Sequence, residues 1–259
     1  MQFKQWIKFT GVALLATTFA VSSQAEIWSS TEVHYSSGDL LNPFSKQEDE
    51  DSTQIITLQH AGGHKYGKNF FFVDHSRSDT GSSFYGEWYL TFSLGAITGS
   101  DMSFGMVKDV GLLAGINLAP GVNKMYTLPG VSLALDLPGF AFANLDITGY
   151  NNIMTDGSSG EKSSYMLDFN WAYPFKAGGL SWSVEGHAEY IAGRDMKVGT
   201  GKLEDWILMQ PQLRMDLGEA LGNEAGNFYV GLEYQYWKNK LGQKDKNEST
   251  VQLLTVWNF

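Results

Sequence analysis

The sequence predicts an all-β fold, a transmembrane antiparallel β-barrel, and three observations lead to this prediction. In the last expected strand, Val251, Leu253, Thr255, Trp257 and Phe259 form an apolar row at every second position, and the chain stops on the aromatic Phe259. Such a terminal strand is typical of bacterial outer-membrane barrels. Several other segments of about ten residues alternate in the same way, which is the length of a tilted strand that spans a bilayer. The third observation is an export signal at the start of the chain.

The first 25 residues have the pattern of a secretory signal peptide. Two lysines precede an apolar stretch from Gly11 to Val21, and Ser23-Gln24-Ala25 supplies small residues at a cleavage site. A membrane anchor is the alternative, but the stretch is too short to span a bilayer comfortably and no basic stop-transfer cluster follows it. We therefore expect a signal peptide at residues 1–25 and a mature chain that begins at Glu26.

Composition fits one exported barrel domain at residues 26–259. The chain has no cysteine, which removes disulfides, thiolate nucleophiles and cysteine-ligated metals together. Its formal net charge is −10, and removal of the signal lysines makes the mature chain more acidic still. Nucleic acid is therefore not expected as a partner, because phosphate binding needs a basic surface. No Pro/Ser-rich linker divides the domain.

In the first half of the chain the strand pattern is interrupted. Phe70-Phe71-Phe72-Val73 is a continuous apolar run, and glycines with Pro120 and Pro129 break the alternation further on. The strands expected here lie near 27–36, 52–60, 69–77, 83–94, 105–117, 125–136 and 140–150.

The second half alternates clearly. Between Tyr165 and Phe175, an aromatic and apolar row opposes a more polar row that includes Asp168 and Asn170. The further strands expected are 180–190, 207–217, 228–236 and 251–259. The total is twelve, with ten or fourteen left open, and twelve strands enclose a narrow pore suited to a single small solute.

The connections are expected to alternate in length, as in a barrel with both termini in the periplasm. Short turns include Leu137-Pro138-Gly139 and Lys176-Ala177-Gly178-Gly179. The longer polar loops, expected on the outer side, are Ser37 to Asp51, Asn151 to Lys162, Ala192 to Glu204 and Asn239 to Glu248.

A family resemblance adds to this interpretation. It is carried by Thr57-Leu58-Gln59-His60, by Tyr66-Gly67-Lys68-Asn69-Phe70-Phe71-Phe72-Val73-Asp74, and by Tyr85-Gly86-Glu87-Trp88 leading into Ser93-Leu94. In these segments the chain resembles the Tsx-type nucleoside-specific channel-forming proteins of Gram-negative outer membranes. The resemblance implies a twelve-stranded barrel in the cell outer membrane whose narrow lumen binds nucleosides weakly and lets them diffuse through. It also implies phage and colicin receptor roles in some members.

The candidate pore-lumen residues are those that lie opposite an apolar row or within a matched motif. They are Phe72, Asp74, Glu87, Tyr89, Asp168, Asn170, Glu185, His187, Glu189, Arg214 and Glu233. Aromatic rings can stack on a base, and carboxylates and amides can hydrogen-bond ribose hydroxyls. The alternative is that these polar residues brace the barrel, with Arg214 in an ion-pair network. Phe72 could equally face lipid.

Two other functions stay open beside a selective channel, namely an outer-membrane enzyme and a surface receptor that uses the long loops. Ser181 and Ser183 lie near His187 on one strand, but a row along a strand does not by itself make a catalytic triad. We therefore expect no enzymatic activity. His60, His64 and His75 and the acidic run Glu48-Asp49-Glu50-Asp51 are expected to be solvated, so no metal or cofactor is predicted.

Overall fold

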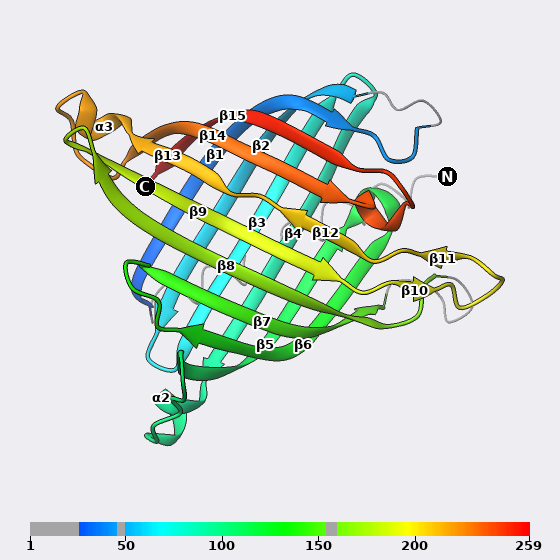
Figure 1. The fold of residues 1–259 in the computed structure, drawn as a ribbon, viewed down its shortest axis with the longest axis horizontal. Helices are drawn as coiled ribbons and strands as arrows, with labels where there is room; N and C mark the ends of the chain where they lie inside the picture. The colour runs from blue at the N-terminus through cyan, green and yellow to red at the C-terminus, as the bar shows by residue number, and fades with distance from the viewer. Residues whose placement is uncertain (1–25, 46–49, 154–159) are drawn as a thin grey trace, which may run out of the picture.

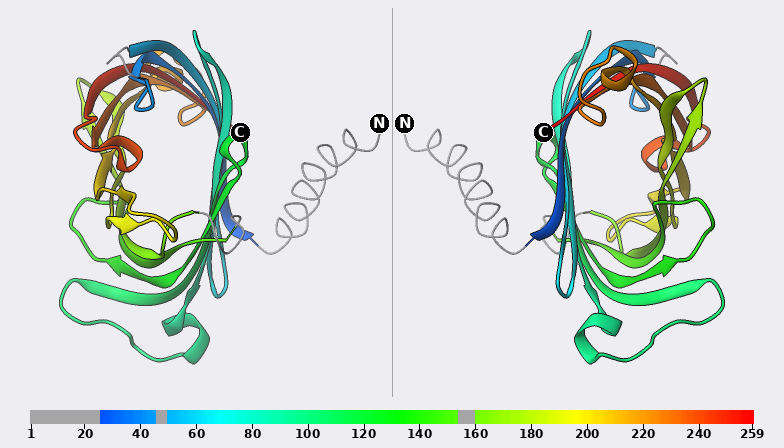
Figure 2. Two further views of the ribbon diagram at one scale, coloured as in Figure 1. Left: turned by 90° about the vertical axis from the view of Figure 1, so that its right-hand side faces the viewer. Right: turned by 90° about the vertical axis from the view of Figure 1, so that its left-hand side faces the viewer.

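The computed structural model describes residues 26–45, 50–153 and 160–259. The predicted signal peptide at 1–25 lies outside these residues and stays a prediction. The described chain forms one long antiparallel sheet that curls into a barrel, and the end views in Figure 2 show its strands as a continuous wall. Among the described residues, no helix is long and apolar enough to cross a membrane.

The strands of the barrel wall are β1 (Glu26–Leu41), β2 (Glu50–His64), β3 (Gly67–Ser78), β4 (Gly81–Ser93), β5 (Val107–Ala119), β6 (Lys124–Leu135), β7 (Phe142–Asn152), β8 (Ser164–Ala177), β9 (Leu180–Ile191), β12 (Trp206–Met209), β13 (Gln212–Asp216), β14 (Phe228–Lys238) and β15 (Glu248–Asn258). A separate hairpin joins β10 (Arg194–Asp195) to β11 (Lys202–Leu203). Within the described residues, the connections carry four short helices: α2 (Leu94–Thr98), η2 (Pro120–Val122), α3 (Leu217–Ala220) and η3 (Lys240–Gly242).

The sheet closes because β1 pairs with both β2 and β15, with Val33 opposite Trp257 at the seam. Strands β12 and β13 both pair with β9 and with β14, so together they make one crossing of the wall. The barrel therefore has twelve crossings, which confirms the predicted fold and strand count. Both chain ends of the described barrel lie at the same end of the wall (Figure 1).

One crossing is broken where the sequence predicts a continuous strand at 207–217. Pro211 has no backbone N–H to give to the ladder, so regular pairing ends at Met209 and resumes at Gln212. The neighbouring strand adapts through Gly186, whose φ is +144° and where an added Cβ would lie 2.2 Å from the Gln210 carbonyl oxygen. Leu217, predicted to end the strand, begins α3 instead.

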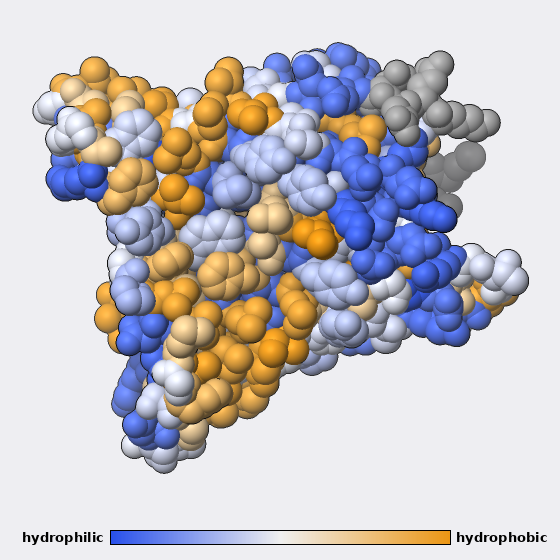
Figure 3. Space-filling view, viewed as in Figure 1, coloured by the Kyte–Doolittle hydropathy of each residue, from blue (hydrophilic) through white to orange (hydrophobic). Residues whose placement is uncertain are grey.

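Most outward-facing side chains of the wall are apolar and most inward-facing ones are polar, apart from an inward-facing apolar cluster that includes Leu128, Met166 and Ile191. In β15, Val251, Leu253 and Trp257 are exposed on the outside, whereas Gln252 is fully buried on the inside. Figure 3 shows apolar side chains over much of the wall, with hydrophilic side chains gathered at the end that carries β10 and β11. This arrangement fits a barrel with lipid around its middle.

Connection lengths follow the predicted rule only in part. The two predicted short turns lie at the end that holds the C-terminus, here called the inner end, and the four predicted long loops lie at the opposite, outer end. However, Asp79 and Thr80 form a two-residue turn at the outer end, and β1 continues to Leu41 within the predicted first loop. The inner end carries longer connections at α2 and α3. Small polar residues around Gly81 allow the tight outer turn.

Candidate functional site in the barrel lumen

The strand register determines which residues point into the barrel, because directly opposed residues of neighbouring strands share a face. Phe72 lies opposite Glu87, Asn170 opposite His187 and Asp168 opposite Glu189. Followed round the sheet, this pairing places all the candidate residues on the inner face: Phe72, Asp74, Glu87, Tyr89, Asp168, Asn170, Glu185, His187, Glu189, Arg214 and Glu233. The structure divides them into two facing walls and a buried brace.

Strands β3 and β4 supply an aromatic wall with carboxylates. The Phe72 ring lies 6.0 Å from the Tyr85 ring, measured between centroids, at an interplanar angle of 51°. The Tyr85 hydroxyl donates a hydrogen bond to Glu87 Oε1 at 2.5 Å. One step along the same faces, Asp74 Oδ1 accepts a hydrogen bond of 2.6 Å from the Thr57 hydroxyl. This wall therefore offers flat ring surfaces next to hydrogen-bond acceptors.

Asn117 on β5 holds this wall in place. Its Nδ2 donates to Glu87 Oε1 at 2.8 Å and to the Tyr85 oxygen at 3.1 Å. Its Oδ1 accepts the Tyr89 hydroxyl at 2.9 Å. Since one buried amide contacts three side chains of β4, the rings and the carboxylate have defined orientations.

Strands β8 and β9 supply the facing wall. His187 Nδ1 lies 3.2 Å from Asp168 Oδ1, and His187 Nε2 lies 2.9 Å from the side-chain oxygen of Gln210. Asn170 Nδ2 donates to Asp168 Oδ2 at 2.9 Å and to Asp146 Oδ2 at 3.1 Å. This wall is thus a row of hydrogen-bonded acids, amides and an imidazole.

The lumen between the two walls is accessible to solvent. The side chains of His187, Glu185 and Asp168 keep 29%, 25% and 14% of their surface exposed. In the ring of twelve crossings, β8 is five crossings from β3 and β9 is five crossings from β4, so the two walls lie across the lumen from each other. A flat solute with polar edges can therefore contact rings on one side and polar groups on the other.

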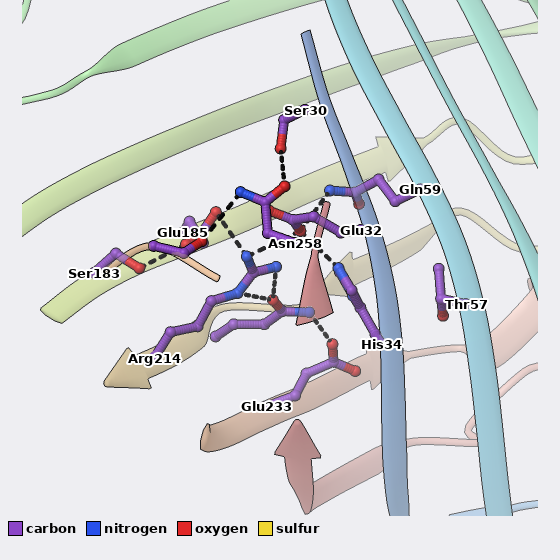
Figure 4. Close-up of polar contacts among 12 residues, drawn as sticks. Ser30, Glu32, His34, Thr57, Gln59, Ser183, Glu185, Arg214, Glu233 and Asn258 are labelled. Carbon is purple, nitrogen blue, oxygen red and sulfur yellow. Dashed lines mark hydrogen bonds and ion pairs between the residues drawn. The ribbon is translucent and has the colours of Figure 1, made fainter. Parts of the chain in front are cut away.

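Arg214 belongs to the brace (Figure 4). It is only 4% exposed, and its Nη1 lies 3.1 Å from Glu32 Oε2 and 3.3 Å from Glu185 Oε2. Its Nε and Nη2 donate to Gln212 Oε1, and the Gln212 amide donates to Glu233 Oε2 at 2.5 Å. The chain of contacts ties β13 to β1, β9 and β14, which is the structural role weighed for Arg214 in the sequence.

Lys68 is a lumen residue that the candidate set lacks. Its Nζ donates to Asn144 Oδ1 at 2.8 Å, and this bond joins β3 to β7, which are not neighbours in the sheet. Lys68 shares the inward face of Phe72 and Asp74 by the two-residue period, so the motif could have indicated it. Tyr85 lies two residues before Glu87, so the same period indicates that it also faces the lumen. Asn117 and Gln210 lie in segments where glycine and proline obscure the alternation.

The residues considered for catalysis or metal binding have other partners. Ser183 donates to Glu185 at 2.6 Å, whereas His187 contacts Asp168 and Gln210. On the outer face, His60 lies 3.1 Å from Glu26 and the His75 ring stacks on Phe84 at 4.6 Å.

No cluster of three or more His, Asp or Glu side chains suited to a metal occurs in the described part of the chain. Glu48 and Asp49 of the acidic run lie outside the described residues.

A family model described as nucleoside-specific channel-forming protein, Tsx, matches residues 27–256. The chain belongs to this family. The family and the closed barrel together identify it as an outer-membrane channel, which confirms the resemblance seen in the sequence. No curated protein shows significant sequence similarity to the chain.

Solved structures of similar shape are distant in sequence. The KdgM porin is 10% identical, with a TM-score of 0.48 over 89% of this chain and 99% of that one. The COG4313 outer membrane channel from Pseudomonas putida F1 is 11% identical, with a TM-score of 0.49 over 91% of this chain and 98% of that one.

Proposed function

We propose that nucleosides diffuse through the lumen by binding weakly between the two walls. One observation carries the proposal: an aromatic surface on β3 and β4 faces a row of hydrogen-bonding side chains on β8 and β9. A nucleoside has the same two sides, a flat base and a sugar with hydroxyl groups. The base would stack against Phe72 and Tyr85, and the ribose would exchange hydrogen bonds with Asp168, Asn170 and His187.

The pairing of these side chains with one another supports weak binding. Asn170 and His187 already have hydrogen-bond partners within the protein, so a solute replaces existing hydrogen bonds and gains only the difference. A channel needs this property, because a solute that binds too tightly does not leave.

The carboxylates of both walls also favour neutral solutes over anions. We propose passage with no chemical turnover, since His187 is held by Asp168 and Gln210 instead of by a serine.

A pair of neighbouring phenylalanines provides a matched test. Phe72 faces the lumen, whereas Phe71 faces outward and stacks on His60 at 5.4 Å. Base stacking on an aromatic side chain contributes about 1–3 kcal/mol, so Phe72→Ala should raise the half-saturating nucleoside concentration for uptake into proteoliposomes at least about fivefold. Phe71→Ala should leave it unchanged. Equal half-saturating concentrations for the two variants would argue against stacking in the lumen.

The same variants separate a channel from a surface receptor. A phage or colicin receptor role, which the resemblance implies for some family members, would use the outer loops and would tolerate loss of Phe72. Nucleoside passage would not.

A further inference from the structure

Two outer loops, β7 to β8 and β9 to β12, are joined to each other at the barrel mouth. Glu161 and Met196 form an isolated antiparallel bridge. The backbone N–H of Lys162 donates to the Asp195 carbonyl at 2.8 Å, and the Lys162 ammonium lies 3.2 Å from the Asp195 carboxylate. Because several contacts connect them, the described parts of the two loops behave as one unit.

This unit is fastened to the inside of the barrel wall by Arg194 and Glu161. Arg194 is 4% exposed and Glu161 is 2% exposed, and Arg194 Nη2 donates to Glu161 Oε1 at 3.3 Å. The guanidinium carbon lies 4.7 Å from the ring centroid of Trp206 and 4.9 Å from that of Tyr150. Both of these side chains point into the barrel. Glu161 also accepts a hydrogen bond from the Tyr126 hydroxyl. We call this ion pair with its three rings the loop latch.

No hydrogen-bond partner exists among the described residues for Arg194 Nε and Nη1. The guanidinium is therefore held mainly by ring faces and by one carboxylate. Cation–π contacts strengthen when an arginine is desolvated, and a buried charge that loses its partner destabilises the structure. The latch should thus depend strongly on both members of the ion pair.

Around the latch, the lumen is filled. Six inward-facing hydrophobic side chains on this side of the barrel have at most 7% of their surface exposed: Tyr126, Leu128, Tyr150, Met166, Ile191 and Trp206. These residues come from β6, β7, β8, β9 and β12. These six side chains therefore fill the lumen beside the latch and leave little room for solute there.

On the other side of the mouth, the described residues line a cavity. A cavity of about 330 Å³ lies at the outer ends of β1 to β4, and its lining includes Leu41, Thr53, Ser76 and Ser83. Ser76 and Ser83 lie directly opposite each other, one step outward from Asp74 and Tyr85 on the same inner face. The part of the cavity formed by Ser76 and Ser83 therefore borders the aromatic wall.

We propose that the loop latch is a specificity-determining element: it closes the β6 to β9 side of the outer mouth and confines solutes to the cavity over β1 to β4. Solutes thereby meet the aromatic wall first, and solutes too large for the cavity are excluded. The proposal concerns the route and size of the pore and does not require the solute to be a nucleoside.

Single-channel conductance in planar bilayers tests the proposal with small ions as the probe. Glu161→Gln and Arg194→Gln release the latch and should open the closed side. Conductance rises with the open cross-section, so each variant should conduct about twice as much as the wild type, and both should admit larger sugars in swelling assays. Unchanged conductance and unchanged sugar cut-off in both folded variants would overturn the proposal.

A second set of variants keeps the test valid if the latch variants fold poorly. Ser83→Trp fills the cavity and should cut the conductance at least about twofold, since it obstructs the proposed route. Ser52→Trp is the matched control, because Ser52 points outward next to the inward-facing Thr53. In the double variant Ser83→Trp with Glu161→Gln, the second side is open and conductance should recover. Equal conductance of the Ser83→Trp and Ser52→Trp proteins would refute the route.

Discussion

At the residue scale, the lumen holds two kinds of polar side chain. Some can exchange their hydrogen-bond partners for a solute, and others are buried and cannot. His187 and Asp168 are partly exposed and hydrogen-bonded, whereas Arg214 is buried and has carboxylates from two different strands beside it. An arginine with a fixed fork of donors suits such a crossing point. His187 and Asp168 are therefore available to a solute, whereas Arg214 holds the neighbouring Glu185 in position.

Removal of the Arg214 charge should destabilise the barrel. In Arg214→Gln, Glu32 and Glu185 lose their shared cation, and loss of one partner of a buried ion pair costs about 3 kcal/mol. This loss is measured as the difference between the free energies of unfolding of the variant and the wild type, obtained by urea titration in lipid vesicles. Arg77→Gln is the control, because Arg77 is exposed at the outer end of β3 and should change the free energy by less than about 0.5 kcal/mol. Equal losses in the two variants would contradict the role of Arg214 as a brace.

At the element scale, strand alternation made most of the wall predictable from the sequence. In β8 and β9 the apolar and polar rows identify the inward face directly, because each side chain two residues on returns to the same face. In β3, Phe70-Phe71-Phe72-Val73 has no alternation, so the sequence could not orient Phe72. The register with β4 settles its direction.

The loops were not predictable in this way. Arg194 and Glu161 are 33 residues apart, and no period links a loop residue to the wall it contacts. Their burial depends on how two loops meet inside a closed barrel, which is a tertiary property. The same reason explains why Lys68 and Asn144, from strands that are not neighbours, could not be paired from the sequence.

The latch should persist in acid. Burial alone would raise the pKa of Glu161, but the Tyr126 hydrogen bond and the charges of Lys124 and Arg194 outweigh it and lower the pKa from 4.5 to about 2. A carboxyl whose pKa is lower in the folded protein stabilises it above pH 4.5, and this contribution is lost only as the pH falls toward 2. The conductance ratio of Glu161→Gln to wild type should therefore stay constant from neutral pH to pH 4.5. A ratio that already approaches one over that interval would show that Glu161 titrates normally.

At the scale of the whole molecule, the barrel is asymmetric about its axis. One side of the mouth is filled with aromatic and aliphatic side chains around the latch, and the other side holds a cavity whose lining includes Ser76 and Ser83, next to the aromatic wall. Twelve crossings enclose a narrow lumen, with the two walls on opposite sides of it. The fold, the location in the outer membrane and the channel class follow from the sequence pattern and the family, whereas the solute route depends on the loops.

The most direct test of nucleoside passage is the current through single channels of the refolded protein in a planar bilayer, titrated with a nucleoside and, separately, with free ribose. Stacking between the walls predicts a reversible, saturable block by the nucleoside at concentrations where ribose has no effect. A conductance that responds equally to both solutes, or to neither, would contradict nucleoside binding in the lumen.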